Sequence, residues 1–411
     1  MSPAATRPTL DQIRSQFPAL ASSTVFFENA GGSQVPQVVA DAIRDYLLDS
    51  YVNLGAGYAE SRRATQTVDE AHDFVNLFMN GTGTGKVILG SSSSGLIRML
   101  ADCYAEVLQP GDEIVIGQSG HEANIGPWVR LERMGVRVRF WNLDRTTQSQ
   151  PICELEELLN ERTKIVAFVH VSNLLGEVVD VADIARRAHH VGARVVVDGV
   201  AYAPHHAIDV AAWDVDWYVY STYKVFGPHM AALYGRADAI AELTGPNHFF
   251  IPCDYVPGKF ELGCISHEGC AGLLALGDYL AFLAGTPGQP VTRETVTAAF
   301  EVAASYERPL QARLLDYLSR QPGVRIVGPA HGGPERVATI SFVHDRVSPP
   351  EISAACDAAG IGMRHGHMYA YRLCEGLGIA PDPGVIRVSM AHYNTPDEVE
   401  RLIAVLDGVL G

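Results

Sequence analysis

Two side chains that could carry out chemistry lie at the ends of apolar segments in the middle of the chain. Three valines at 195–197 precede Asp198, and the apolar residues 217–220 precede a short polar run with Lys224. Short apolar runs that end on a polar residue are typical of buried strands that deliver a side chain to the carboxyl edge of a parallel sheet. Ligands bind at that edge in open α/β sheets. The sequence therefore predicts an acid and an amine at one site.

This pair of residue types has a specific chemical use. A lysine amine can form an imine with the aldehyde of pyridoxal 5'-phosphate (PLP), and a carboxylate beside the pyridine nitrogen keeps that nitrogen protonated. The ring then withdraws electrons from the α-carbon of a substrate. Lys224 and Asp198 are the candidates for these two roles. The pair alone leaves open the alternative of an ordinary acid at a strand end and a surface lysine.

Length and composition narrow the class of protein. The 411 residues are 47% hydrophobic and 19% charged, which is typical of a globular protein long enough for two domains. The formal charge of -16 is not offset by a basic stripe, so we expect no nucleic-acid partner. We expect no membrane association and a cytoplasmic location, because no run resembles a signal peptide or a membrane span. The seven cysteines are scattered, so we expect no metal site and no disulfide framework.

Strands and helices are predicted to alternate along most of the chain. Between Val87 and Val219, short apolar runs alternate with segments of helical spacing such as residues 181–191. This alternation predicts a mainly parallel sheet built from βαβ units. Beyond about residue 290, the pattern predicts a smaller α+β domain, with helices at 292–318, 350–359 and 395–410 and strands at 337–343 and 385–389.

The residues around Asp198 and Lys224 resemble those of class V aminotransferases of fold-type I, and within them the cysteine desulfurases and selenocysteine lyases. That group carries Asp-Gly-Ala-Gln and Ser-x-His-Lys-x-x-Gly-Pro, where this chain has Asp198-Gly199-Val200-Ala201 and Ser221-Thr222-Tyr223-Lys224-Val225-Phe226-Gly227-Pro228. The resemblance spans nearly the whole chain. It implies PLP as the cofactor and the α/β fold of fold-type I PLP-dependent transferases. A large domain with a mainly parallel seven-stranded sheet is expected over residues 20–285, and a smaller α+β domain from residues 1–19 and 286–411.

Further motifs imply residues that bind the cofactor. The segment His121-Glu122-Ala123-Asn124-Ile125-Gly126-Pro127-Trp128 is similar to the family segment whose histidine stacks over the PLP ring, which gives His121 a role in moving protons. A Gly/Ser turn that opens a helix suits a phosphate, and the resemblance assigns the phosphate to Ser93 and Ser94. His170-Val171-Ser172-Asn173 places Asn173 near the cofactor O3' and the substrate carboxylate. Ser221 and Tyr223 complete the implied cofactor-binding set on this chain.

Other motifs imply contacts with a substrate and with a second subunit. Residues 387–395 resemble the family segment Arg-x-Ser-x-x-x-Tyr-Asn-Thr, so Arg387 is expected to bind the substrate α-carboxylate, a task that suits a guanidinium. Asn29 and Arg364 are further candidates for substrate binding. Residues 259–268 resemble a family loop that crosses to the second subunit, where its threonine donates a hydrogen bond to the phosphate of the cofactor bound there. Here Cys264 replaces that threonine, so Ser266 is the candidate donor. The resemblance implies a homodimer with active sites at the interface.

The chain departs from the desulfurase pattern at the nucleophile. Residues 364–370 resemble Arg-x-Gly-His-His-Cys-Ala but have Tyr369 at the cysteine position, and a phenol cannot hold a persulfide. Cys374 could substitute only if its loop were rearranged. Ala201 also replaces a glutamine that donates to the cofactor O3'. These departures suggest a pocket adapted to another amino acid.

The predicted function is that of a PLP-dependent enzyme, lyase or transferase, acting on a small amino acid through an external aldimine and a quinonoid. Cysteine desulfurase-like or carbon-sulfur lyase chemistry without a persulfide cysteine is the main expectation. A class V aminotransferase or an amino-acid epimerase is one alternative. A non-catalytic sulfur carrier or partner protein is another, although it would need none of the chemistry of Asp198, Lys224, His121 and Arg387.

Overall fold

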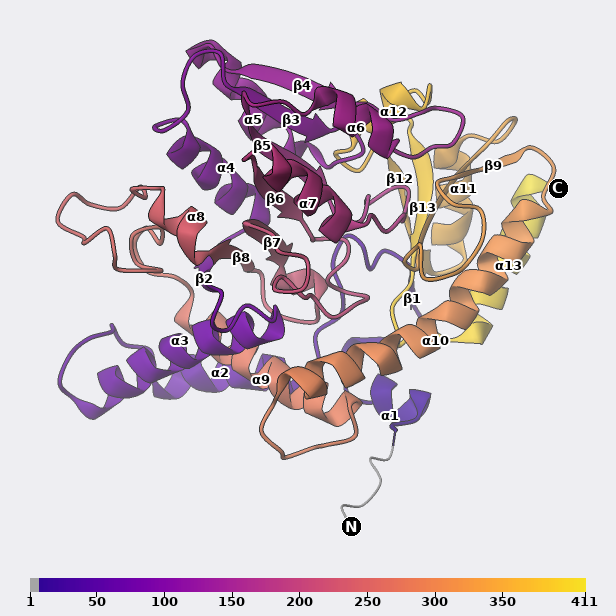
Figure 1. Cartoon of the computed structure of the whole chain (residues 1–411). Helices are drawn as coiled ribbons and strands as arrows, with labels where there is room; N and C mark the ends of the chain where they lie inside the picture. The colour runs from indigo at the N-terminus through magenta and orange to yellow at the C-terminus, as the bar shows by residue number, and fades with distance from the viewer. Residues whose placement is uncertain (1–6) are drawn as a thin grey trace.

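The computed structural model describes residues 7–411, whose strands form three sheets (Figure 1). The largest has seven strands in the order β2-β8-β7-β6-β5-β3-β4. It is mainly parallel, because β8 alone runs antiparallel to its neighbours β2 and β7. The strands are β2 (Gly85–Gly90), β3 (Glu113–Gly117), β4 (Arg137–Trp141), β5 (Thr163–Val169), β6 (Arg194–Asp198), β7 (Trp217–Ser221) and β8 (Ala231–Arg236).

Separate apolar cores cover the two faces of this sheet, because successive side chains of a strand point to opposite faces. In β6, Val195 and Val197 belong to one core and Val196 to the other. The first core includes side chains of α3 (Ala59–Phe78), α7 (Val181–His190) and α9 (His267–Leu283). The second includes side chains of α4 (Ser93–Tyr104) and α5 (Gly126–Val129). Helix α2 (Gln37–Asp49) lies beside α9, which also packs against α3 (Figure 1).

The C-terminal part of the chain forms a smaller antiparallel sheet in the order β12-β13-β10-β9. The 27-residue helix α10 connects the two regions, since Val296 packs in a core of the large sheet and Leu314 in the core of the small one (Figure 1). The elements are β9 (Val324–Val327), β10 (Thr339–His344), β12 (Arg364–Gly366), β13 (Val385–Ser389), α10 (Arg293–Ser319), α11 (Pro349–Ala358), α12 (Tyr371–Gly376) and α13 (Pro396–Leu410).

The N-terminal segment contacts both regions. Thr9 caps α1 (Leu10–Arg14), and Ile13 packs in a core of the large sheet. The next strand, β1 (Val25–Phe26), instead pairs in parallel with β11 (Ile361–Gly362) of the smaller region. The domain boundaries at residues 20 and 285 stay predictions, and residues 1–6 of the expected small domain lie outside the described part. Across residues 7–411, no helix has both the length and the apolar character needed to cross a membrane.

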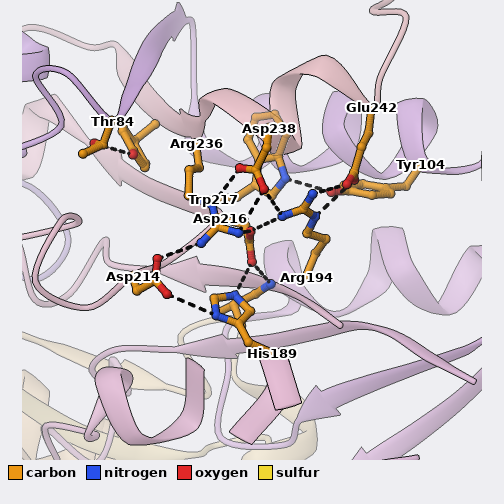
Figure 2. Close-up of polar contacts among 12 residues, drawn as sticks. Thr84, Tyr104, His189, Arg194, Asp214, Asp216, Trp217, Arg236, Asp238 and Glu242 are labelled. Carbon is orange, nitrogen blue, oxygen red and sulfur yellow. Dashed lines mark hydrogen bonds and ion pairs between the residues drawn. The ribbon is translucent and has the colours of Figure 1, made fainter. Parts of the chain in front are cut away.

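An ion-pair network joins the amino ends of the strands that carry the candidate acid and amine (Figure 2). At its centre is Asp216, which is fully buried and precedes β7. Its carboxylate lies 2.8 Å from Arg194 Nη1, 2.7 Å from Arg236 Nη2 and 2.8 Å from His189 Nε2. It also accepts a 2.7 Å hydrogen bond from the backbone N–H of Val195. These contacts hold β6, β7 and β8 together at the edge opposite the candidate site.

Candidate active site

The structure brings the predicted acid and amine to one cavity. Because β5, β6 and β7 are parallel, their carboxyl ends meet at one edge of the sheet. Asp198 is the last residue of β6, and Lys224 ends the short 3-10 turn that follows β7. Both line a cavity at this edge. The other predicted residues that line it are Ser93, Ser94, His121, Asn173, Ser221 and Tyr223.

Burial sets the electrostatics of the acid and the amine. The pKa of the Lys224 amine is lowered to about 8, chiefly by burial and further by Arg387, while Asp198 opposes the shift. The pKa of Asp198 is raised by burial, against the effects of a hydrogen bond from the backbone N–H of Val200 (2.9 Å) and of the Lys224 charge. A lysine of this kind has a substantial neutral fraction near neutral pH, so it can attack a carbonyl group.

His121 lies beyond the end of β3 and lines the same cavity. Its Nδ1 accepts a hydrogen bond of 3.0 Å from the backbone N–H of Ala123, so the proton of the neutral ring is on Nε2. Burial lowers the pKa of His121 to about 4, and the charges of Lys224 and Arg387 add to the effect. The imidazole is therefore neutral at pH 7, with an N–H donor available on Nε2.

Hydroxyl groups and a helix N-terminus meet at one end of the cavity. Ser93 is the first residue of α4, and the hydroxyl of Ser221 donates to its hydroxyl at 3.0 Å. Ser92 caps the helix by accepting from the backbone N–H of Gly95 at 3.1 Å. A helix N-terminus of this kind favours an anion through its N–H groups and its dipole. This end of the cavity therefore suits a phosphate group.

Two buried polar groups next to the cavity lack partners. The Asn173 amide donates to the carbonyl of Met368 at 2.8 Å, but its Oδ1 has no hydrogen-bond partner among residues 7–411. Arg387 is 4% exposed, and its Nη1 donates to the backbone carbonyl of Asn173 at 3.4 Å. The Nε of Arg387 also lacks a partner among the described residues. Burial lowers the pKa of Arg387 to about 10. A bound anion would pair with the Arg387 Nε donor, and a donor group of a ligand would pair with the Asn173 Oδ1 acceptor, which would offset the cost of leaving these atoms unpaired.

Arg364 and Arg387 do not line the cavity itself, although they are cross-strand neighbours on β12 and β13. The side chain of Arg364 is 59% exposed and forms an ion pair of 2.5 Å with Glu28. Glu28 was not among the candidate site residues that the sequence indicated. Its carboxylate favours the charged form of Arg387, so it belongs to the electrostatics of the site.

Two other predicted residues are occupied elsewhere. The amide of Asn29 donates to the carbonyls of Phe26 and Ser389, each at 2.9 Å, and accepts from the hydroxyl of Tyr393. Asn29 therefore ties the N-terminal segment to β13, and its geometry gives no support to the expected contact with substrate. Ser266 caps α9, accepting from the Gly269 N–H at 3.0 Å, and does not line the cavity. Its contact with a partner's phosphate stays a prediction.

The segment in place of the desulfurase nucleophile adds a contact that sequence reasoning missed. The ring of Tyr369 lies against His121, with 5.1 Å between the ring centroids. No cysteine of the described residues lines the cavity. Cys374 is fully buried, and burial raises the pKa of its thiol to about 11, so it is a poor nucleophile.

Known proteins resemble this chain over nearly its full length. Residues 25–402 match the family model of class V aminotransferases. The aminotransferase-like protein FGM3 of Gibberella zeae is 36% identical over 411 residues, which cover 98% of each chain. A cysteine desulfurase of Dickeya dadantii is 30% identical, with 97% of this chain and 96% of that protein covered. The crystal structure of the Escherichia coli cysteine desulfurase CsdA superimposes with a TM-score of 0.83 at 27% identity, covering 98% of this chain and 99% of that one.

Fold and relatives together define the class of protein. The architecture is that of fold-type I, a fold of PLP-dependent enzymes, as the sequence predicts. The chain belongs to the class V aminotransferase family and has cysteine desulfurases among its relatives. It is therefore a member of a family of PLP-dependent enzymes.

Proposed function

We propose that this chain binds PLP through Lys224 and acts at the α-carbon of a small amino acid. The observation that carries this proposal is the shared cavity of Lys224 and Asp198, in which burial lowers the pKa of the amine to about 8. A solvated surface lysine would keep its ordinary pKa.

The residues of the cavity fit PLP at each of its functional groups. Lys224 would bind the aldehyde, Asp198 the pyridine nitrogen, and the α4 N-terminus with Ser93 and Ser221 the phosphate. His121, Asn173, Ser94 and Tyr223 would line the remaining space around the ring. Bound PLP supplies an electron sink for the α-carbon of an amino acid.

The chain's own groups then bind the amino acid and move its proton. Arg387 would bind the α-carboxylate, because its buried Nε is a donor without a described partner. The unpaired Oδ1 of Asn173 is an acceptor, so Asn173 would bind a donor group of the substrate or the cofactor beside that carboxylate. Lys224 would remove the α-proton, since a lysine with a lowered pKa can act as a base near neutral pH. His121 would donate from Nε2, which remains available because Nδ1 is engaged by Ala123. Buried Asp198 would keep its negative charge opposite a protonated ring nitrogen.

Lyase-type chemistry without a persulfide is the reaction we favour, because no cysteine lines the described cavity and the Cys374 thiol is buried. Transamination is the second candidate, supported by the relative described as aminotransferase-like. Epimerisation would use the same removal of the α-proton. A non-catalytic sulfur carrier finds no support in Cys374, because burial raises the pKa of its thiol to about 11.

We also infer a cytoplasmic homodimer with active sites at the interface. The loop between α8 (Ala237–Ala241) and α9 exposes large apolar side chains, among them Phe249 (100% exposed), Phe250 (66%) and Leu262 (61%). Exposed apolar patches of this kind favour a protein partner. The described cysteines are all free thiols, which fits a reducing compartment. Sedimentation of the purified protein tests the dimer.

Exchange of the α-proton in D₂O tests the function whatever the final product. The protein is loaded with PLP and incubated with a panel of small amino acids, and NMR follows loss of the α-proton signal and appearance of products. We expect exchange with at least one amino acid, with release of a side-chain fragment for a lyase or a keto acid for an aminotransferase. Absence of PLP absorbance and of exchange across the panel would refute the proposal. Lys224→Ala is the control for exchange that does not involve the site.

A further inference from the structure

The backbone of Met368 and Tyr369 adopts an unusual conformation near the cavity. Their φ angles are 46° and 60°, in the left-handed region that residues other than glycine seldom adopt. A bulky aromatic residue is particularly uncommon there. Such a conformation persists only where the surrounding structure imposes it, and it is concentrated at functional sites.

Hydrogen bonds connect this segment to two segments that contribute residues to the cavity. The carbonyl of Met368 accepts from the Asn173 amide at 2.8 Å. The carbonyl of Tyr369 accepts at 2.8 Å from the backbone N–H of Glu122, the residue after His121. The backbone N–H of Tyr369 donates to Nδ1 of His367 at 3.0 Å. The two strained residues therefore bridge the segments that carry Asn173 and His121.

The same conformation places the ring of Tyr369 against His121. The ring centroids are 5.1 Å apart and the planes are tilted by 34°. His121 lines the cavity and Tyr369 does not, so the phenol contacts the imidazole from outside the cavity. Tyr369 is 67% exposed, so burial of its own surface contributes little that would offset the backbone strain. Besides the two hydrogen bonds of its carbonyls, the strained backbone provides the contact with His121 and an edge contact with the ring of His367, with 6.2 Å between the ring centroids.

We propose that Tyr369 is a positioning residue for His121. Its ring covers the outer face of the imidazole and holds it over the cavity, and the left-handed backbone of Met368 and Tyr369 exists to place that ring. The inference rests on the proposed function only in giving His121 a task in catalysis. The contact between the two rings requires no cofactor, so it can be tested in the PLP-free protein.

Substitutions at Tyr369 separate the ring from the backbone that carries it. Tyr369→Gly removes the ring and leaves a residue that adopts positive φ without strain. Tyr369→Phe keeps the ring and removes only the hydroxyl. Tyr371→Ala is the matched control, since Tyr371 is also an exposed aromatic residue (48%) but packs against His367, with 5.5 Å between the ring centroids.

Modification of histidines by diethyl pyrocarbonate, followed by peptide mapping of the PLP-free protein, measures the cover over His121. The exposed His248 in the same digest serves as the reference. In Tyr369→Gly we expect the rate at His121 relative to His248 to rise about tenfold, because removal of the cover exposes the ring. We expect the parental ratio in Tyr369→Phe and in Tyr371→Ala. An unchanged ratio in Tyr369→Gly, or an equal rise in Tyr371→Ala, would overturn the proposal.

Two further measurements distinguish a positioning role from a structural one. The unfolding temperature of Tyr369→Gly should not fall, because glycine relieves the strain at this position. With PLP bound, Tyr369→Gly should slow α-proton exchange and Tyr369→Phe should restore it. A lower unfolding temperature with unchanged labelling of His121 would make Tyr369 structural. Increased labelling in a protein that never binds PLP would refute the proposed function and leave the positioning contact intact.

Discussion

Lys224 should react as an amine at neutral pH even without a cofactor. Burial and the charge of Arg387 lower its pKa from 10.5 to about 8. At pH 7 the neutral fraction is then about 10%, against roughly 0.03% for an ordinary lysine, a difference of about 300-fold. Because only the neutral amine is nucleophilic, the acylation of Lys224 should reach half of its maximal rate at a lower pH than that of an ordinary lysine.

The chain suits such a measurement because it has four lysines, Lys86, Lys164, Lys224 and Lys259. The PLP-free protein is treated with a trace of acetic anhydride from pH 6 to pH 10, and mass spectrometry of peptides gives the extent of acetylation at each lysine. Lys86 is exposed and serves as the reference. Lys259 is 3% exposed and donates to the carbonyls of Ile240 and Leu243, so it should react slowly at every pH.

Two variants should move the pH at which Lys224 is half-maximally acetylated, and they should move it in opposite directions. Arg387→Gln removes a positive charge and should raise the pKa of Lys224, so that its acetylation at pH 7 falls. Asp198→Asn removes the charge that favours the protonated amine, so the pKa should fall and acetylation should rise. A Lys224 that titrates together with Lys86 would refute the reasoning, as would variants that leave its midpoint unchanged.

Three further predictions concern the cofactor site and the scaffold. Asp198→Asn should retain PLP absorbance but slow α-proton exchange by roughly 100-fold or more, because an amide cannot balance a protonated ring nitrogen. NMR in D₂O measures the exchange, and exchange at the parental rate would contradict this role of Asp198. Ser221→Ala should weaken PLP binding by about 1–3 kcal/mol, or roughly 5- to 150-fold in Kd by absorbance titration, if its hydroxyl binds a charged phosphate. An unchanged Kd would exclude that contact. Asp216→Asn should lower the free energy of unfolding in urea by about 1.5–3 kcal/mol, because a fully buried carboxylate that contacts Arg194, Arg236 and His189 is replaced by a neutral amide. Asp238 is exposed, so Asp238→Asn should lower the free energy of unfolding by less than about 1 kcal/mol. Equal losses of stability in the two variants would contradict the importance of the burial of Asp216.

The elements that position the site could be predicted from the sequence because their patterns are local. Asp198 and Lys224 follow apolar runs that are strands β6 and β7 of the structure. Parallel pairing then brings the ends of these strands to one edge, as βαβ topology requires. The helices of the smaller region also show clear apolar periodicity, and α13 begins at Pro396 with Thr395 as its cap.

Other elements carried weaker signals. Helix α9 was not predicted, because its residues 267–283 are apolar on nearly every side and show no amphipathic period. Strand β4 at the edge of the large sheet has the sequence Arg-Val-Arg-Phe-Trp, whose arginines weaken the apolar pattern. Helix α3 begins at Ala59, and its polar first turns carry no apolar stripe that would indicate this start.

Side-chain pairing within the site could not be predicted at all. The amide of Asn29 is taken up by Phe26, Ser389 and Tyr393, and the last two lie more than 350 positions away in the chain. The ring of Tyr369 meets His121 only because its backbone adopts positive φ, which no sequence pattern for a tyrosine indicates. Such contacts depend on tertiary structure.

Reduction of the PLP-loaded protein with borohydride, followed by peptide mapping, shows which amine holds the cofactor. The reduction fixes the pyridoxyl group to whichever amine binds it, and only four lysines compete in this chain. We predict a pyridoxyl group on Lys224 alone, at about one per subunit, and its loss in Lys224→Ala. A pyridoxyl group on Lys86, Lys164 or Lys259, or on none of the lysines, would contradict the account.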